Sequence, residues 1–535
     1  MDRFRPPPPS LPLRAWFFCV ALAVMLLLRG GASWDEMLRF LVGLNPLGPD
    51  GESAVHVLLK RALMSFGLIS LALAIGLSYA LAGAMLVVRL GGRVSRFSGW
   101  LGSALAGVPP MAWALGAIYF FIRMRHLSVE TLFPLPAPAG GDSGMMHLAR
   151  VLWSWLVPAL VLAIPVFGTA MFSLTHRLSA LLENPKLVEL KARGLDHSQI
   201  VFRHLVPQLR VHLARMARPC AAMLLAMAVP VEELLGFNGW GQFVASNLKE
   251  PGANSAAMAS ALWMGGWMLA GCLGWLGMLD KKDLPFLAEV TPESSHGSSR
   301  AAVLSGVVIA LALIAMPYWT RSYDLWPIFA EAHATWAFEI KRAAMVSLGA
   351  LLLVLLCGPA MCLMRNWKWI LNRGVAATMN VIPLLLALLL FDHGAARNWL
   401  FITIAAALPG IAAYRDAFRD EEQSKLADAA HVLGVRGFAL WWRHLLPGAL
   451  PGLLGGAVRN TANIMLMLAM LDYFNANGTP SSWGALMRVH ADDILDDPLP
   501  ALAPAVVLAL WCVSFRLLSW GFRTESPRPA TTTFP

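Results

Sequence analysis

Long uninterrupted apolar runs constrain this chain more than any other feature. The run "LMSFGLISLALAIGLSYALAGAMLVV" (63–88) exceeds the roughly 20 helical residues needed to cross a bilayer. Similar runs are "VLSGVVIALALIAMPYW" (303–319) and "MVSLGALLLVLLCGPAMCLM" (345–364). Inside lipid, only helices and closed barrels satisfy the polar groups of the backbone, and runs this long and apolar favour helices. We therefore predict an all-α polytopic membrane protein.

Charged residues are few and unevenly placed. They make up 14% of the 535 residues, against about 25% in soluble domains, and the mean hydropathy is +0.60. Within a net charge of +10, Lys and Arg gather in 175–218 and 415–443, whereas 392–398 and 472–498 hold few of them. Because Lys and Arg favour cytoplasmic loops, both basic segments are predicted to face the cytoplasm. A nucleic-acid partner has no support.

The apolar runs divide into twelve predicted spans, six on each side of a polar cytoplasmic linker. The spans lie near 11–28, 63–88, 99–121, 151–174, 217–235, 256–279, 301–319, 343–364, 371–391, 399–414, 449–471 and 501–520. The first is longer than a signal-peptide core of about 7–15 residues, so we interpret it as a retained span, with both termini cytoplasmic. The predicted organisation is a first half at 1–279, a linker at 280–300, a second half at 301–523 and a tail at 524–535.

The two halves repeat each other in the basic loops. Five positions recur 240 residues later, each time just before an apolar span: Gly194, Arg203, His204, Leu205 and Pro207 match Gly434, Arg443, His444, Leu445 and Pro447. Five matches in one register are unlike a chance agreement. Repeated halves are usual in transporters, where a path runs between related bundles.

Each basic loop is predicted to form a helix, a turn and a second helix. Asn184 and Pro185 suit the start of the first helix, and Gly194 suits a left-handed stop. In the second loop Gly434 is expected to end the first helix and Pro447 to bound the second. Two interpretations of these loops remain open from the residues alone: a rigid cytoplasmic knob for a partner, or an interfacial helix pair on lipid headgroups.

The second loop resembles a known family. "DAAHVLG" (428–434) followed by "RHLLP" (443–447) resembles the EAA loop of binding-protein-dependent ABC importer permeases, and "ARGLDHSQIVFRHLVPQL" (192–209) is similar to that loop in the peptide/nickel branch. "VEELLGFNGWGQ" (231–242) and "MLDKKD" (278–283) resemble elements of one peptide-permease subunit. "TPSSWGALM" (479–487) resembles an element of its partner subunit. The chain therefore resembles two permease subunits fused in one polypeptide.

The resemblance implies partners and site residues. It implies two cytoplasmic ABC ATPase subunits that use ATP and Mg²⁺, a periplasmic or lipid-anchored solute-binding protein, and a place in the bacterial inner membrane among its lipids. The loops 184–208 and 421–448 would dock the ATPases. The implied contact residues are Glu189, Ala192, Gly194, Leu195, His204 and Pro207, and then Asp428, Ala429, Ala430, Gly434, His444 and Pro447.

Three departures from the family pattern concern the identity of the solute more than the mechanism of transport. Glu189 lies five residues before Gly194 rather than six. Asn238 stands where the family has proline, and Leu468 where the second subunit usually has glutamate. A small solute, peptide-like by resemblance, is expected, and the scarcity of charge inside the spans favours a path that does not grip a strongly ionic one.

Acidic and glycine residues at the far ends of two spans form the other candidate site. Ionisable groups at such places are costly and usually functional, and the glycines indicate an irregular turn. The candidates for an outer gate or path are Glu232, Gly239, Gly241, Asp472, Trp483 and Gly484. A structural hydrogen-bonding anchor is the alternative interpretation. Arg459, Asn460 and Asn463 share one helix face, with helix packing favoured over a place in the path.

Catalysis by this chain is not expected. The sequence has no GxxxxGK[ST] loop for nucleotide phosphates, no HExxH or GxSxG motif, and no zinc-like spacing of Cys and His. We expect no bound cofactor and no metal, with ATP hydrolysis left to partners. Two other functions remain open: an ion- or proton-coupled secondary transporter built from repeats, and a membrane scaffold that transports nothing.

Overall fold

All regular elements in the described part of the chain are helices. The computed structural model describes residues 54–90, 101–102, 105–120, 144–182, 193–194, 206–249, 298–321, 326–363, 429–430, 432–435, 437–474, 482–494 and 496–522, with isolated positions 261, 264–265, 268 and 403. The first half contains α3 (Ala54–Leu90), α5 (Pro110–Tyr119), α7 (Gly144–Leu182), α10 (Val206–Leu234) and α11 (Trp240–Lys249). The second contains α13 (Ser298–Ile314), α14 (Met316–Arg321), α15 (Trp326–Ala334), α16 (Trp336–Leu363), α22 (Gly437–Leu440), η4 (Trp441–Leu445), α23 (Leu446–Phe474), α24 (Trp483–Val489), α25 (Pro498–Leu518) and η5 (Ser519–Phe522).

Four described segments are long and apolar enough to cross a membrane: His56–Val87, Trp153–Thr175, Trp441–Phe474 and Pro498–Leu518. These agree with four of the predicted spans, and the all-helical class is confirmed for the described residues. The predicted spans 11–28 and 371–391 lie outside the described residues, and 256–279 and 399–414 lie mostly outside them. The total of twelve therefore stays a prediction.

Two predicted spans are interrupted by proline. The span 99–121 breaks at Val108 and Pro109, and Pro110 begins α5. The span 301–319 breaks at Ala315, and Pro317 lies in the first turn of α14. Proline has no N–H to donate and disfavours helical geometry in the residue before it. The expectation of continuous helices there was wrong, because the mean hydropathy of a segment does not reveal that a proline in it lacks a backbone N–H donor.

Small residues set the packing within the first half, where α3 lies against α7. A Cβ placed on Gly76 would lie 2.8 Å from the Val166 Cβ, and one on Gly67 would lie 2.8 Å from the Trp155 ring. Such close backbone approach is the usual basis of helix association in membranes, where lipid removes the hydrophobic driving force. In the second half, Gly306 of α13 approaches α25 in the same way, and Ser514 Oγ donates to its carbonyl at 2.8 Å.

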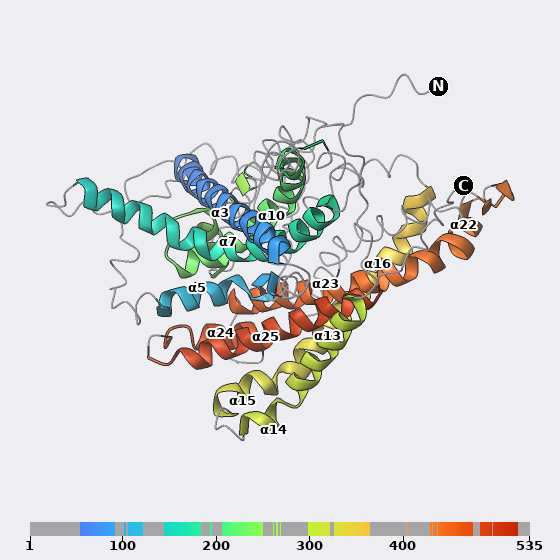
Figure 1. Cartoon of the computed structure of the whole chain (residues 1–535). Coiled ribbons are helices and arrows are strands. Elements are labelled where there is room, and N and C mark those ends of the chain that lie inside the picture. The colour runs from blue at the N-terminus through green and yellow to red at the C-terminus, as the bar shows by residue number, and fades with distance from the viewer. Residues whose placement is uncertain are drawn as a thin grey trace.

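The two halves share a buried core. Figure 1 shows α3, α7 and α10 on one side, α13 to α16 and α23 to α25 on the other, and α5 alongside α25. Met111 and Ala112 of α5 and Ala226 of α10 belong to the same buried cluster as the apolar face of α23. Leu115 lies in a buried cluster with Ala491, Ile494 and Ala501 of the second half. We call α10 in the first half and α23 in the second half the central spans.

Candidate functional site

A buried carboxylate joins three helices of the first half. Glu232, near the end of α10, is fully buried. Its Oε1 accepts from Ser65 Oγ of α3 at 2.6 Å, and its Oε2 accepts from the Gly241 N–H at 2.6 Å. The Ser65 hydroxyl in turn accepts from the Trp240 N–H at 2.7 Å. We call Ser65, Glu232, Gly239, Trp240 and Gly241 the Glu232 cluster.

Local sequence explains why Glu232 reaches the start of α11. Gly236 has φ of 63°, and the Phe237 N–H bonds the Glu232 carbonyl at 2.9 Å, so α10 ends in a left-handed turn that returns the chain. The carboxylate then lies at the N-terminus of α11, where N–H groups lack helical partners and the helix dipole favours negative charge. This compensates for removing the charge from water, a large penalty without such donors.

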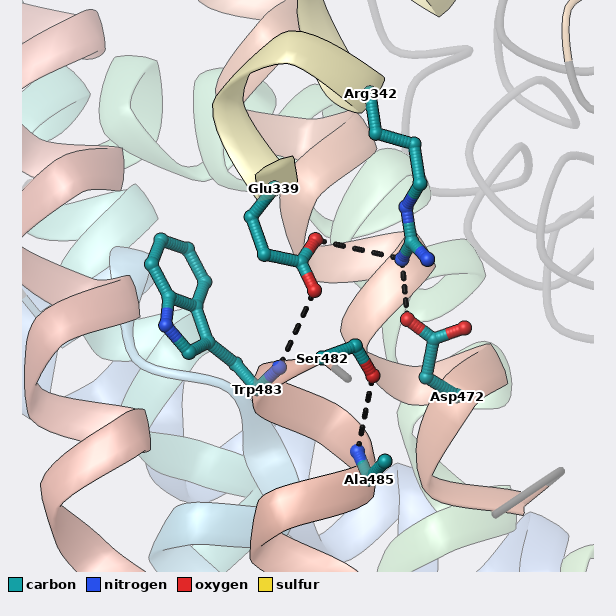
Figure 2. A network of polar contacts seen from close by, with 6 residues as sticks. All are labelled: Glu339, Arg342, Asp472, Ser482, Trp483 and Ala485. Atoms are coloured by element: carbon teal, nitrogen blue, oxygen red, sulfur yellow. Dashed lines mark hydrogen bonds and ion pairs between the residues drawn. The ribbon is translucent and has the colours of Figure 1, made fainter. Parts of the chain in front are cut away.

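The second half holds its equivalent element with an ion network. Figure 2 shows Arg342 of α16 between two carboxylates, Asp472 of α23 and Glu339 of its own helix. Arg342 pairs closely with Asp472 and lies 3.4 Å from Glu339 Oε2. The Trp483 N–H donates to Glu339 Oε1 at 3.2 Å, and Ser482 Oγ caps α24 by accepting from the Ala485 N–H. We call Glu339, Arg342, Asp472, Ser482 and Trp483 the Arg342 cluster.

The two clusters occupy matching places in the repeat. Glu232 and Asp472 are 240 residues apart, the spacing already found in the basic loops, and both Trp240-Gly241 and Trp483-Gly484 begin a short helix. Sequence reasoning missed the partners Ser65, Glu339 and Arg342, and also Arg61, whose charge lies near that of Glu232. A signal was present, because "KRALM" (60–64) in α3 recurs as "KRAAM" (341–345) in α16.

Three of the predicted glycines are required by close contact. A Cβ on Gly239 would overlap the Glu232 carboxylate and the Ser65 hydroxyl. One on Gly241 would lie 2.8 Å from the Ala228 carbonyl, and one on Gly484 would overlap the Ala469 carbonyl oxygen. In both halves the Trp-Gly helix therefore presses directly on the backbone of the central span.

Both tryptophans are buried anchors in this conformation. Trp240 is 0% exposed and its indole N–H donates to the Ala261 carbonyl, whereas Trp483 is 1% exposed and donates to the Ala332 carbonyl of α15. The structure thus brings Glu232, Gly239 and Gly241 together, and Asp472 with Trp483. These contacts are those of a hydrogen-bonding anchor, and a role in gating stays a prediction.

The basic loops contain the expected left-handed turns. Gly194 has φ of 81° and Gly434 has φ of 78°. At Gly434, the Val435 N–H bonds the Ala430 carbonyl at 3.0 Å, the long bond that closes a helix ending in left-handed glycine. Of the predicted contact residues, those outside the described residues are Glu189, Ala192, Leu195, His204 and Asp428.

The Gly434 turn exposes apolar side chains. Val432 is 87% exposed and Leu433 is 80% exposed, while Ala430 is buried against the second-half core. Ala429 is exposed, and Pro447 lies farther along the chain on the exposed side of α23. The turn is therefore an apolar projection on a buried base, which we call the Gly434 knob and define as residues 429–430 and 432–435.

Pro447 does not end a helix, contrary to the sequence expectation. The chain is helical from Gly437 to Phe474, passing through the π-helical segment η4, which includes His444. The Leu446 N–H bonds the Trp441 carbonyl across the wider turn. Proline cannot donate to the carbonyl four residues back and crowds it, and a local π-turn is one way a helix accommodates such a defect. In the first half, Pro207 is the second residue of α10.

The Gly434 knob and the Arg342 cluster lie at opposite ends of one continuous helix. Residues 437–474 span about 55 Å at 1.5 Å per residue, more than the roughly 30 Å of the hydrocarbon core. Among the described residues, no group of three or more His, Cys, Asp or Glu side chains is arranged to hold a metal ion.

These features define a helical protein with four described segments able to span a membrane and a polar anchor at one end of both α10 and α23. Residues 302–519 match the family described as "Binding-protein-dependent transport system inner membrane component". That match covers most of the second half and less than half of the chain. The matched part is therefore similar to the permease components of such transport systems.

Curated permease proteins are also similar to part of this chain. The chain is 24% identical over 128 residues to the glutathione transport system permease protein GsiD of Escherichia coli O1:K1, and equally to those of Shigella flexneri and Salmonella typhimurium. The alignment covers 23% of this chain and 42% of each relative, so the chain spans less than half the length of the relatives it matches. No solved structure matches the chain.

Proposed function

We propose that this chain is the transmembrane permease component of an ABC importer of the bacterial inner membrane, with two permease halves fused. Two cytoplasmic ATPase subunits hydrolyse ATP with Mg²⁺ and drive the halves between outward and inward access. A periplasmic or lipid-anchored binding protein delivers a small solute. The internal repeat at a spacing of 240 residues supports the fusion, and the match of residues 302–519 supports the class.

The observation that carries the proposal is the Gly434 knob. Two large apolar side chains more than three-quarters exposed are unfavourable in water and mark a surface that a partner covers. The helix of residues 437–474 is about 25 Å longer than the hydrocarbon core is thick. With the Arg342 cluster at the outer boundary, the knob extends past the inner headgroups, which favours a protein partner over an interfacial helix pair.

A peptide-like solute is the favoured cargo. The relatives named above carry glutathione in their name, and the loop motifs resemble the peptide/nickel branch. The Glu232 and Arg342 clusters hold the Trp-Gly helices against α10 and α23 at the ends away from the knob. We propose that these helices form the outer mouth and move with the central spans as they tilt.

The test is a charge placed on the knob, with a matched control at the other end of the same half. Leu433→Glu should abolish co-purification of a P-loop ATPase from native membranes in mild detergent, because a carboxylate is not tolerated in an apolar interface. Val489→Glu, at a position 45% exposed on α24, should leave ATPase recovery unchanged. The measurement is the amount of ATPase recovered with each variant, identified by mass spectrometry of the eluate.

The outcomes separate the alternatives. Equal recovery of the ATPase with both variants would remove the knob from the interface. Absence of any ATPase even from the wild-type protein, together with solute uptake that follows an ion gradient, would favour a secondary transporter. Neither an ATPase nor transport would favour a scaffold.

A further inference from the structure

Two partly buried apolar side chains join the halves at one end of the central spans. Leu234 of α10 and Phe474 of α23 each pack against both large buried clusters, that of the first half and that which includes the apolar face of α23. Among the described residues, no other partly buried apolar side chain does so. Leu234 also packs against the cluster around Leu115 of α5, and α11 lies against α23. The halves are therefore in contact at the end that carries the Glu232 and Arg342 clusters.

The two residues occupy matching positions of the sequence repeat. Phe474 follows Leu234 by 240 residues. At the same spacing Ala226 matches Leu466, and both belong to the buried cluster of α23. In a protein built of two halves related by an axis, equivalent residues come together only beside that axis. Because transporters built from repeats bind and pass their solute at the interface between the repeats, a contact beside the axis is where such a path is closed.

Polar side chains border this pair. Glu233 and Tyr473, the residues just before Leu234 and Phe474, are also 240 positions apart, and the charge of Glu233 acts on the Tyr473 hydroxyl. The Arg488 guanidinium of α24 lies over the Tyr473 ring, 5.8 Å from its centroid. A carboxylate of the first half and a guanidinium of the second therefore lie beside one tyrosine. Both are partly exposed, and water weakens the attraction between such charges to about 0–1 kcal/mol, so they can separate at little cost.

Contacts between the halves are less buried than contacts within each half. Trp240 and Trp483, which fasten the Trp-Gly helices, are 0% and 1% exposed, and moving either away would leave a buried indole N–H without its acceptor, at a cost of about 1–3 kcal/mol. Leu234 and Phe474 are both partly exposed, so their separation transfers less apolar surface to water. Movement at this end of the molecule would therefore occur between the halves.

We propose that Leu234 and Phe474, bordered by Glu233, Tyr473 and Arg488, form the outer gate, the layer at which the halves separate when the outer mouth opens. This rests on the proposed importer function and identifies the contact that its movement has to break. The structure is then the state in which the outer mouth is closed. The Glu232 and Arg342 clusters stay intact during opening, because their contacts lie within the halves.

The first test detects opening without requiring transport. Ala226→Cys places a thiol eight residues before Leu234, about 12 Å farther from the outer end of α10. The full chain in right-side-out membrane vesicles is treated with a membrane-impermeant maleimide, and labelling of this thiol is followed by peptide mass spectrometry. Adding Leu234→Ala and Phe474→Ala should speed the labelling severalfold, because the closed layer loses two large side chains. Equal rates with and without these two substitutions would overturn the proposal.

A matched control removes the same two types of side chain elsewhere. Leu63 is 62% exposed on α3 and Phe120, at the end of α5, is 48% exposed, so Leu63→Ala with Phe120→Ala should leave the labelling rate unchanged. A similar rise in this control would indicate general loosening and would overturn the gate. Glu233→Gln alone should raise the rate less than the Leu234→Ala, Phe474→Ala pair does, and an unchanged rate would remove Glu233 from the gate.

A reversible cross-link in cells that contain the native partners gives the second test. Leu234→Cys with Phe474→Cys is joined by a short bis-thiosulfonate, and the joined peptides are verified by mass spectrometry. Uptake of labelled trialanine should be lost and should return after reduction, because the cross-link holds the gate closed. The control joins Ser347→Cys with Thr461→Cys, two positions of the second half whose hydroxyls bond the same Ala457 carbonyl. That cross-link should leave uptake unchanged.

The outcomes distinguish the gate from the importer function. Full uptake while the first pair remains cross-linked would overturn the gate. Absence of trialanine uptake by the wild-type protein would count against the proposed peptide importer. Faster labelling of Ala226→Cys in the Leu234→Ala, Phe474→Ala protein would still identify the gate in that case, and unchanged labelling would reject it.

Discussion

The Glu232 cluster and the Arg342 cluster hold the same Trp-Gly element with different chemistry. In the first half one carboxylate accepts directly from the backbone of α11, and a serine completes the link to Trp240. In the second half, two carboxylates surround one arginine, and the carboxylate that accepts from Trp483 comes from α16 rather than from the central span.

The difference follows from chain length. Trp240 follows Glu232 by eight positions, whereas Trp483 follows Asp472 by eleven. Asp472 also has one methylene fewer than Glu232, and it pairs with Arg342 instead of reaching the new helix. Glu339 then takes over the contact with Trp483. One backbone arrangement is thus held by hydrogen bonds in one half and by ionic contacts in the other, and only the second depends on a single cation.

The largest effect is expected from removing that cation. Arg342→Met leaves the carboxylates of Glu339 and Asp472 without their cation, which costs about 3–5 kcal/mol of unfolding free energy. Arg61→Met should cost only about 1 kcal/mol: it removes a cation lying over the Phe243 ring, while Glu232 keeps its hydrogen-bond donors. The measurement is the apparent free energy of unfolding in an SDS titration followed by circular dichroism.

A compensated variant makes the result specific. Combining Arg342→Met with Glu339→Gln and Asp472→Asn removes all three charges, and should recover most of the loss because no uncompensated charge stays buried. Equal losses of unfolding free energy for Arg342→Met and Arg61→Met would show that both clusters depend on their arginines to the same extent. The contrast drawn above between the two halves would then be wrong.

A smaller effect should appear in both halves. Gly241→Ala and Gly484→Ala each place a Cβ against the backbone of the central span, and overpacking of this kind costs about 1–3 kcal/mol. Gly116→Ala is the matched control, because nothing lies within 4 Å of its Cβ position in α5, and it should gain up to about 1 kcal/mol of helix propensity. Thermal unfolding of the three purified variants tests this. A loss confined to one half would show that only one Trp-Gly helix is tightly packed.

The sequence identified some of the residues in each cluster but not the residues that they bond. Glu232, Asp472 and the Trp-Gly pairs stand out because ionisable residues and glycines are unusual at the ends of apolar spans. The left-handed turns at Gly194 and Gly434 were predicted correctly, since a glycine after a capped helix has a specific backbone meaning.

The partners were missed because they are distant in the chain. Ser65 lies 167 residues from Glu232, and Arg342 lies 130 residues from Asp472. Only the packing of α3 on α10 and of α16 on α23 makes them neighbours, and hydropathy does not contain that information. The repeated Lys-Arg-Ala-x-Met pattern marked the register of these helices but not which residue would bond. In the same way, the helix through Pro447 depends on a π-turn that no pattern of apolar residues predicts.

The smallest effect isolates the serine link of the first half. Ser65→Ala removes the acceptor of the buried Trp240 N–H and one donor to Glu232, and a buried donor left without a partner costs about 1–3 kcal/mol. Ser347→Ala is the control in α16, because its hydroxyl only donates to the Ala457 carbonyl, which also accepts from Thr461. That loss should stay below about 1 kcal/mol.

Hydrogen exchange shows where the serine acts. Without the Ser65 hydroxyl, the Trp240 and Gly241 amides should exchange faster in the Ser65→Ala protein, because α11 loses the hydrogen bond from the Trp240 N–H to α3. Exchange at Trp483 should stay unchanged in the same sample, since Glu339 holds that helix independently. Faster exchange at both tryptophans would mean that the Trp-Gly helices open together, and the two halves would then share one cooperative outer mouth.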